Sequence, residues 1–134
     1  MPPSEPEQEV PGQTVAIVAE TLYLLNLLLL PVAAFVLLLW LYRKHLRNAP
    51  PLARCHLRQT LSASLWAGVL LVFANVAIFA LGGYRAPYTW VIVVLYFTTA
   101  HASLVLLGTL GLAKAMAGKP YVYPLIGRPC PEIS

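Results

Sequence analysis

Three apolar stretches, each long enough to form a transmembrane helix, dominate this sequence. A helix needs about 20 apolar residues to cross a bilayer, and three such runs are more than a soluble domain of 134 residues could cover. With 59% hydrophobic and 10% charged residues, the chain also has too little polar surface for an ordinary soluble protein. We therefore predict an all-α integral membrane protein with three transmembrane helices, over residues 21–42, 60–81 and 88–112.

The segments that flank the apolar stretches have a different composition. Residues 1–13 are rich in proline and glutamate, which predicts a disordered acidic tail. The three-helix transmembrane domain then extends over residues 14–118. Residues 119–134 contain several prolines and alternate Tyr121 and Tyr123 with valine, so we expect a cytoplasmic tail that lies at the interface and docks on the bundle or on a partner.

Two residues interrupt the first apolar stretch. Pro31 lies near its middle, where it removes one backbone donor and frees the carbonyl of Leu27, so we expect a kink or a side-chain partner there. Glu20 lies at the start of the predicted span, and we expect its carboxylate at the outer membrane boundary.

Most of the positive charge lies between the first two spans. Five of the nine Lys and Arg residues are in this basic block, and we predict that they bind anionic lipid head groups: Arg43, Lys44, Arg47, Arg54 and Arg58. The C-terminal part holds three more, and the second loop holds only Arg85. The positive-inside rule then predicts an N-terminus outside and a C-terminus in the cytoplasm. The expected location is the inner (plasma) membrane, with an organelle inner membrane as the alternative.

The basic residues do not indicate nucleic-acid binding, because they flank apolar runs and do not form a stripe among stacking aromatics. Cys55 and Cys130 lack the spacing of a zinc site. Both fall on the predicted cytoplasmic side, where reduced thiols are expected.

The second span continues a helix that begins in the basic block. His56 and Gln59 lie on the helix face that leads to the small residues Ala63 and Ala67, at spacings of three and four. Small residues permit close helix approach in lipid, so this face should meet the other helices.

A resemblance to a known family rests on this approach to the second span. The pattern of a small residue or proline, an apolar residue, then His-x-x-Gln is matched by Pro51, Leu52, His56 and Gln59. A later segment, GKPYVYPL from Gly118, matches a glycine–lysine step followed by aromatic and proline residues. Together they resemble a bacterial family of small membrane proteins of uncharacterised function, related to the twenty-kilodalton subunit of the plastid inner-envelope import translocon. The resemblance covers about residues 22–128. It implies a helical membrane fold and a role near protein translocation, and it implies no catalytic residues.

His101 lies near the midpoint of the third span, and an ionisable residue at that depth is a candidate functional group. The alternative is a structural role, in which its imidazole hydrogen-bonds near the carbonyl freed at Leu27. The predicted contacts within the bundle or with partners are His56, Gln59, His101, Tyr121 and Tyr123.

Neither a nucleophile–base pair nor a carboxylate pair is recognisable, so we predict no catalytic residues, no metal site, no cofactor and no enzymatic activity. Two functions remain. The first is an accessory, scaffold or assembly subunit of a larger membrane complex, with other subunits or further copies of itself as partners. The alternative is a translocon-like or transport component that acts as a homo-oligomer.

Overall fold

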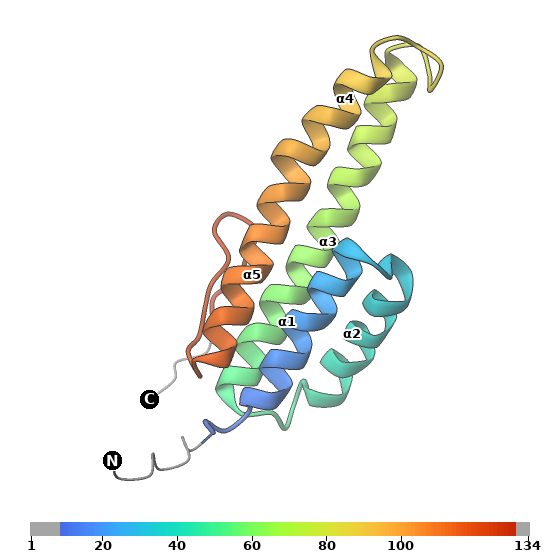
Figure 1. Cartoon of the computed structure of the whole chain (residues 1–134). Helices are drawn as coiled ribbons and strands as arrows, with labels where there is room; N and C mark the ends of the chain where they lie inside the picture. Colours follow the sequence, from blue (N-terminus) through green and yellow to red (C-terminus); the bar gives the residue numbers. More distant parts are fainter. Residues whose placement is uncertain (1–8, 131–134) are drawn as a thin grey trace, which may run out of the picture.

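The computed structural model describes residues 9–130, and the regular elements in this range are all helices (Figure 1). They are α1 (Gln13–Leu28), α2 (Pro31–His45), α3 (Pro51–Ala80), α4 (Thr89–Leu95), the π-helix η1 (Tyr96–His101) and α5 (Ala102–Met116). The last three form one continuous helix of 28 residues, Thr89–Met116. The all-α prediction is confirmed over this range. Most of the predicted acidic tail, residues 1–13, lies outside the described residues.

Two helical hairpins of unequal length make up the bundle. The long hairpin pairs α3 with the continuous helix Thr89–Met116, and the two helices are joined by the turn at residues 81–88, which we call the tip (Figure 1). The short hairpin, α1 and α2, packs only against the opposite half of the long one. We call this thicker end, with the loop at residues 46–50, the base.

The predicted number of membrane spans is wrong. Two helices are long and apolar enough to cross a bilayer, α3 with 30 residues and Thr89–Met116 with 28. The stretch predicted as the first span is divided between the 16-residue α1 and the 15-residue α2. At 1.5 Å per residue these helices are about 22 to 24 Å long, shorter than the roughly 30 Å hydrocarbon core. The chain therefore enters the bundle from the base and returns to it.

Pro31 is the reason for this reversal. Inside a helix its ring would clash with the preceding turn, but at the first position of α2 its missing N–H costs nothing. A residue before proline is also pushed out of the helical region, and Leu30 has φ −129° and ψ 72°. The Leu30 N–H closes the end of α1 by donating to the Leu25 carbonyl at 2.8 Å. A complete turn therefore replaces the expected kink.

The reversal also changes the topology. The amide of Gln13 at the start of α1 donates to the Met116 carbonyl at the end of α5, at 2.8 Å. A Cβ added to Gly12 would lie 3.1 Å from the Cβ of Pro50. The start of α1, the basic loop and the end of α5 therefore meet at the base, whereas the predicted topology has the start of the first span and the end of the third on opposite sides of the membrane.

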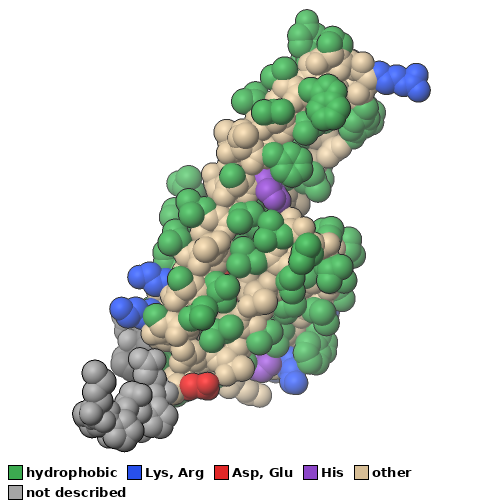
Figure 2. Space-filling model, in the orientation of Figure 1, with side chains coloured by type: hydrophobic (Ala, Val, Ile, Leu, Met, Phe, Trp, Pro, Cys, Tyr) green, Lys and Arg blue, Asp and Glu red, His purple; other side chains and the backbone are tan. Residues whose placement is uncertain are grey.

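Buried side chains gather in the base half, where four helical segments pack together. The largest fully buried apolar side chains there are Tyr23, Leu38, Leu52, Leu57 and Tyr123. The tip half consists of the long hairpin alone, and large side chains such as Phe73 and Trp90 are more than two-thirds exposed. Hydrophobic side chains are exposed along the whole length of the visible face, from the base to the tip (Figure 2). Such a surface suits contact with lipid, which needs no burial of apolar groups.

Candidate functional site

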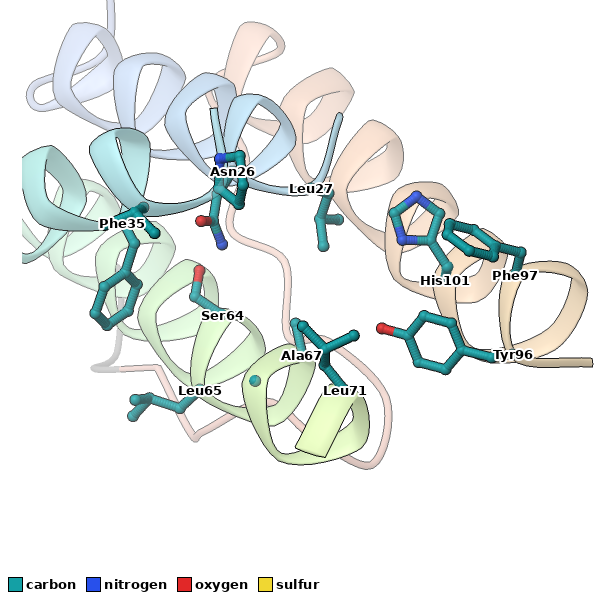
Figure 3. Close-up of a pocket in the computed structure, with 13 residues that line it drawn as sticks. Asn26, Leu27, Phe35, Ser64, Leu65, Ala67, Leu71, Tyr96, Phe97 and His101 are labelled. Atoms are coloured by element: carbon teal, nitrogen blue, oxygen red, sulfur yellow. The ribbon is translucent and has the colours of Figure 1, made fainter. Parts of the chain in front are cut away.

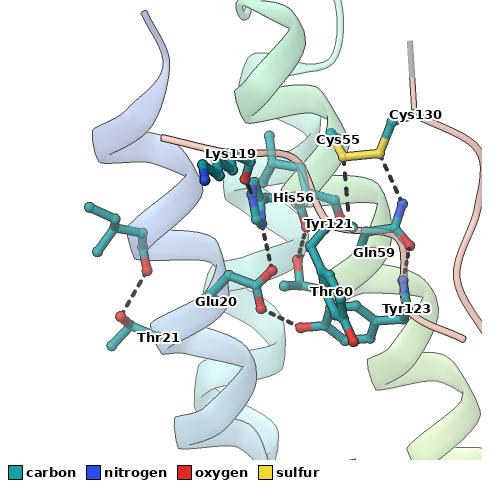
Figure 4. A network of polar contacts seen from close by, with 12 residues as sticks. Glu20, Thr21, Cys55, His56, Gln59, Thr60, Lys119, Tyr121, Tyr123 and Cys130 are labelled. Carbon is teal, nitrogen blue, oxygen red and sulfur yellow. Dashed lines mark hydrogen bonds and ion pairs between the residues drawn. A yellow bond between two sulfur atoms is a disulfide. The ribbon is translucent and has the colours of Figure 1, made fainter. Parts of the chain in front are cut away.

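A buried polar network lies inside the base half, where α1, α3 and the segment after α5 meet (Figure 4). Its central residues are Glu20 from α1 and His56 from α3, both with no exposed surface. Tyr123, from the C-terminal segment that returns along α3, completes the network and is 1% exposed. Buried charged or polar groups are costly unless they are paired, so this cluster must satisfy itself internally.

The imidazole of His56 lies between two oxygen atoms. Its Nδ1 is 2.7 Å from Oε1 of Glu20, and its Nε2 is 2.9 Å from the carbonyl oxygen of Lys119. A carbonyl only accepts hydrogen bonds, so Nε2 must carry a hydrogen. The remaining proton lies between Nδ1 and the carboxyl group, which form either an imidazolium–carboxylate pair or a neutral pair. In both arrangements the pair holds one shared proton and has no net charge.

Tyr123 closes the other side of the carboxyl group. Its hydroxyl donates to Oε2 of Glu20, and its ring packs edge-on against Tyr23, with centroids 5.7 Å apart. Burial raises the pKa of Glu20 above its ordinary value of 4.5, and the hydrogen bonds from His56 and Tyr123 oppose this rise. Burial and the neighbouring carboxylate also raise the pKa of the Tyr123 hydroxyl, which keeps it protonated as a donor.

Gln59 fastens the C-terminal segment one helical turn after His56. Its side-chain oxygen accepts hydrogen bonds from the backbone N–H groups of Tyr123, at 3.2 Å, and Arg128, at 3.0 Å. Its amide nitrogen donates to the Arg128 carbonyl. A Cβ at Gly127 would lie 2.3 Å from the Gln59 oxygen, so only glycine fits where the segment turns over this side chain. One fully buried amide thus replaces the regular backbone pairing that the segment lacks.

Two glycines of α5 make room for this network. A Cβ at Gly111 would lie 2.5 Å from Oε2 of Glu20, and one at Gly108 would lie 2.7 Å from the ring of Tyr23. Gly108 and Gly111 are therefore packing positions, each of which accommodates one polar side chain of α1.

A disulfide between Cys55 and Cys130 joins α3 to the end of the described chain. The expectation that both are reduced thiols is therefore wrong for this structure. The bridge lies beside Gln59, whose amide is 3.4 Å from the Cys130 sulfur. Covalent and hydrogen-bonded attachment thus act on the same short segment.

The structure distributes the predicted contact residues over two places. His56, Gln59 and Tyr123 belong to the base network, and Tyr121 packs against Tyr123, with ring centroids 5.6 Å apart. His101 lies apart from them, in η1, and lines a separate cavity with Leu27 and Pro31. Leu27, Pro31 and His101 line the same cavity and so lie at a similar depth in the bundle, but no hydrogen bond joins His101 to Leu27 within residues 9–130.

The predicted lipid-binding residues all lie near the base, at the base ends of α2 and α3 or, for Arg47, in the loop between these helices. Arg43, Lys44 and Arg47 are exposed, and Lys44 Nζ lies 4.8 Å from the centroid of the Trp40 ring. Arg54 and Arg58 are half-buried on the first turns of α3.

Sequence reasoning missed the central part played by Glu20. We expected it at the outer boundary, but α1 carries it into the base network. Two features of the sequence were available as a signal. Glu20 is the only acidic residue next to an apolar run, and His56 is an ionisable residue on the helix face that should meet the other helices. No group of three metal-ligating side chains occurs within the described part of the chain.

Comparison with known proteins identifies a family. The family model of the magnetosome magnetite crystal formation proteins matches residues 12–130, which include both long helices and the whole base network. Searches among curated proteins and among solved structures found no match. The prediction of a small bacterial membrane protein family is confirmed in this coarser form, whereas the relation to the plastid translocon stays a prediction. The chain is a membrane protein that belongs to the magnetosome magnetite crystal formation protein family.

Proposed function

We propose that this chain is a non-enzymatic accessory protein that is embedded in the magnetosome membrane and takes part in magnetosome assembly. The observation that carries the proposal is the family match, which spans residues 12–130 and so includes both bilayer-length helices. No observation favours the translocon-like alternative.

The non-enzymatic part of the proposal rests on the complete burial of Glu20 and His56. Glu20 and His56 resemble an acid–base pair, but neither has exposed surface, and each oxygen or nitrogen at their ends already has a partner. A general acid or base must come within hydrogen-bond reach of a substrate. The pair therefore holds α1, α3 and the C-terminal segment together.

The distribution of carboxylates supports action within the membrane and not on the crystal surface. The tip, residues 81–88, contains no Asp or Glu. Glu20 is fully buried, and Glu9 is the only other acidic residue within the described range. A surface that binds iron ions through oxygen ligands would need exposed carboxylates close together.

The charges suggest an orientation for this two-span protein. Eight of the nine Lys and Arg residues belong to the base or the segments attached to it, and Arg85 lies at the tip. By the positive-inside rule the base faces the cytoplasm and the tip faces the magnetosome lumen. The exposed Arg43, Lys44 and Arg47 then meet anionic lipid head groups, each contributing about 1 kcal/mol.

Cysteine accessibility tests this orientation. The variants Arg47→Cys and Arg85→Cys, each made in a chain whose two native cysteines are replaced by serine, place a single thiol at the base or at the tip. In intact isolated magnetosomes, a membrane-impermeant maleimide should label Arg47→Cys and leave Arg85→Cys unlabelled until detergent is added. The opposite pattern would reverse the orientation, and labelling of both would contradict a sealed two-span arrangement.

Deletion of the gene from its host tests the function itself. A fluorescent fusion should locate to the magnetosome membrane, and deletion should change the size or number of the crystals seen by electron microscopy. Complementation with Glu20→Gln, which preserves the hydrogen bonds but removes the ionisable group, should restore the crystals as the native chain does. Unchanged crystals after deletion would refute the accessory role, and a folded but inactive Glu20→Gln would refute the non-enzymatic part.

A further inference from the structure

A cavity lies beyond the turn between α1 and α2, at the middle of the long hairpin (Figure 3). Its volume is about 490 Å³, and it is partly open to the outside of the bundle. The α3 residues that line it, between Ser64 and Leu71, flank the midpoint of that 30-residue helix. The cavity therefore lies within the apolar length of the long hairpin, between the basic first turns of α3 and the tip.

Four polar side chains line this cavity: Asn26 of α1, Ser64 of α3, and Tyr96 and His101 of η1. Ser64 of α3 is 5% exposed, and its hydroxyl has no hydrogen-bond partner. Asn26 of α1 and His101 of η1 also make no side-chain hydrogen bond within residues 9–130. In Figure 3 the Asn26 amide and the Ser64 hydroxyl point toward one another. An unpaired polar group in hydrocarbon costs several kcal/mol, because no water is present to pair with it. These groups therefore call for a partner that the chain itself does not supply.

The π-helix shapes one wall of the cavity. The extra residue in its turn brings Tyr96, Phe97 and His101 to the same side, with the rings of Phe97 and His101 5.1 Å apart. Such π-turns are found frequently at functional sites. Together with Phe35 of α2, the wall presents flat aromatic surfaces next to a hydrogen-bonding ring.

The depth and chemistry of the cavity narrow the class of ligand. A phospholipid head group is charged and stays at the interface, so the ligand must be uncharged and soluble in hydrocarbon. An amide, a hydroxyl and an imidazole can each donate a hydrogen bond, so a ligand that offers acceptors can pair with all of them. The donors come from opposite sides, with Asn26 and Ser64 on one side and His101 on the other. A planar ring with a carbonyl oxygen on each of two opposite edges fits this arrangement.

We propose that this cavity binds the head group of a lipid-soluble quinone, with Asn26, Ser64 and His101 donating hydrogen bonds to its two carbonyl oxygens. The aromatic side chains Phe35 and Phe97 pack against the ring, and the hydrocarbon tail leaves through the open side into the lipid. The proposal concerns binding alone and is independent of the role in magnetosome assembly.

Tryptophan fluorescence can measure this binding, because quinones quench it at short range. Trp66 follows the lining residue Leu65 on α3, and Trp40→Phe with Trp90→Phe leaves it as the only reporter. The full chain in quinone-free nanodiscs is titrated with decylubiquinone. We expect quenching that saturates at one quinone per chain, whereas a linear, unsaturable decrease would overturn the proposal.

Two variants test the cavity itself. A Cβ at Gly68 would meet no atom within 4 Å, although Gly68 lines the cavity, so Gly68→Leu fills the space without a backbone clash. It should abolish saturable quenching, while Ser64→Ala should weaken the apparent affinity about fivefold through loss of one hydrogen bond. The matched control is Ser103→Ala, an exposed serine on α5 that does not line the cavity, and it should bind as the parent does. Unchanged binding by Gly68→Leu with a native helical circular dichroism spectrum would overturn the proposal.

Two competing occupants give distinct results. Dioleoylglycerol, which is also neutral and carries ester carbonyls, should not displace decylubiquinone at equal membrane concentration, and displacement would refute the quinone assignment. If the cavity were an interface between two copies, the parent chain would be a dimer by mass photometry and Gly68→Leu a monomer. That result would also refute the proposal.

Discussion

Oε1 of Glu20 lies 2.7 Å from Nδ1 of His56 in a place that water does not reach, and the two side chains share one proton between them. The pair joins residues 36 positions apart in the chain. It fixes the short hairpin to the long one, and its proton count determines how the fold responds to mutation and to pH.

Substitutions at Glu20 should separate geometry from charge. Glutamine can donate to His56 Nδ1 and accept from the Tyr123 hydroxyl, so Glu20→Gln should cost less than about 1 kcal/mol of unfolding free energy. Glu20→Ala leaves both partners unpaired in a buried site and should cost about 3 kcal/mol or more. Chemical unfolding in detergent measures both. Equal losses would show that the negative charge, and not the hydrogen-bond pattern, holds the pair.

The stability of the protein should depend on pH through Glu20. Burial raises the pKa of its carboxyl above the value of 4.5 that it has when exposed, so above pH 4.5 this carboxyl keeps in the folded chain a proton that it releases in the unfolded chain. Its contribution is therefore complete below about pH 4.5 and is lost as the pH rises toward the raised pKa. Thermal unfolding measured from pH 4 upward should show this decrease for the native chain and a smaller one for Glu20→Gln. An identical slope in both would assign the effect to another group.

Reduction of the disulfide should loosen the C-terminal segment without unfolding the helices. The bridge closes a loop of 75 residues, and by chain entropy its loss costs about 4 kcal/mol. Chymotrypsin should then cut after Tyr121, a site that the oxidised form protects because His56 holds Lys119 and Gln59 holds Tyr123 on either side of it. Cys130→Ser without reductant should behave as the reduced native chain does. Protection that persists after reduction would mean that the hydrogen bonds of Gln59 are sufficient.

Two glycines on neighbouring helices should respond in opposite ways to alanine. At Gly111 the new methyl group meets the Glu20 carboxylate at 2.5 Å, and we expect a loss of about 2 kcal/mol as the pair is displaced. At Gly68 it meets nothing, and the higher helix propensity of alanine should add about 0.5 to 1 kcal/mol. Thermal unfolding compares the two variants directly. Stabilisation by Gly111→Ala would contradict the tight placement of the carboxyl group.

The sequence predicts the long hairpin well because its two helices have local signals. The prolines at 50 and 51 mark the start of α3, and the glycines at 82 and 83 mark the tip. The first apolar stretch carries the same hydrophobic signal as a span, and hydropathy does not distinguish one crossing helix from two that meet at Pro31. The decisive restriction acts on the backbone of Leu30, one residue earlier.

The sequence predicts only the part of the base network that α3 contributes. The spacing of His56 and Gln59 indicates a face that meets other helices, but nothing local states which residue they meet. Their partners are Glu20, 36 residues before His56, and the backbone of Tyr123 and Arg128, more than 60 residues after Gln59. Pairing over such distances depends on the topology, and an incorrect first span placed Glu20 at the wrong end of the molecule.

The short hairpin gives the protein a different thickness in each half of a bilayer. At the base, α1 and α2 stand beside α3 and α5, whereas at the tip only α3 and α4 cross the lipid (Figure 1). Each copy therefore occupies more area in the leaflet at its base than in the other leaflet. A wedge of this kind fits a small closed vesicle, with the base in the outer leaflet, better than it fits a flat sheet of membrane.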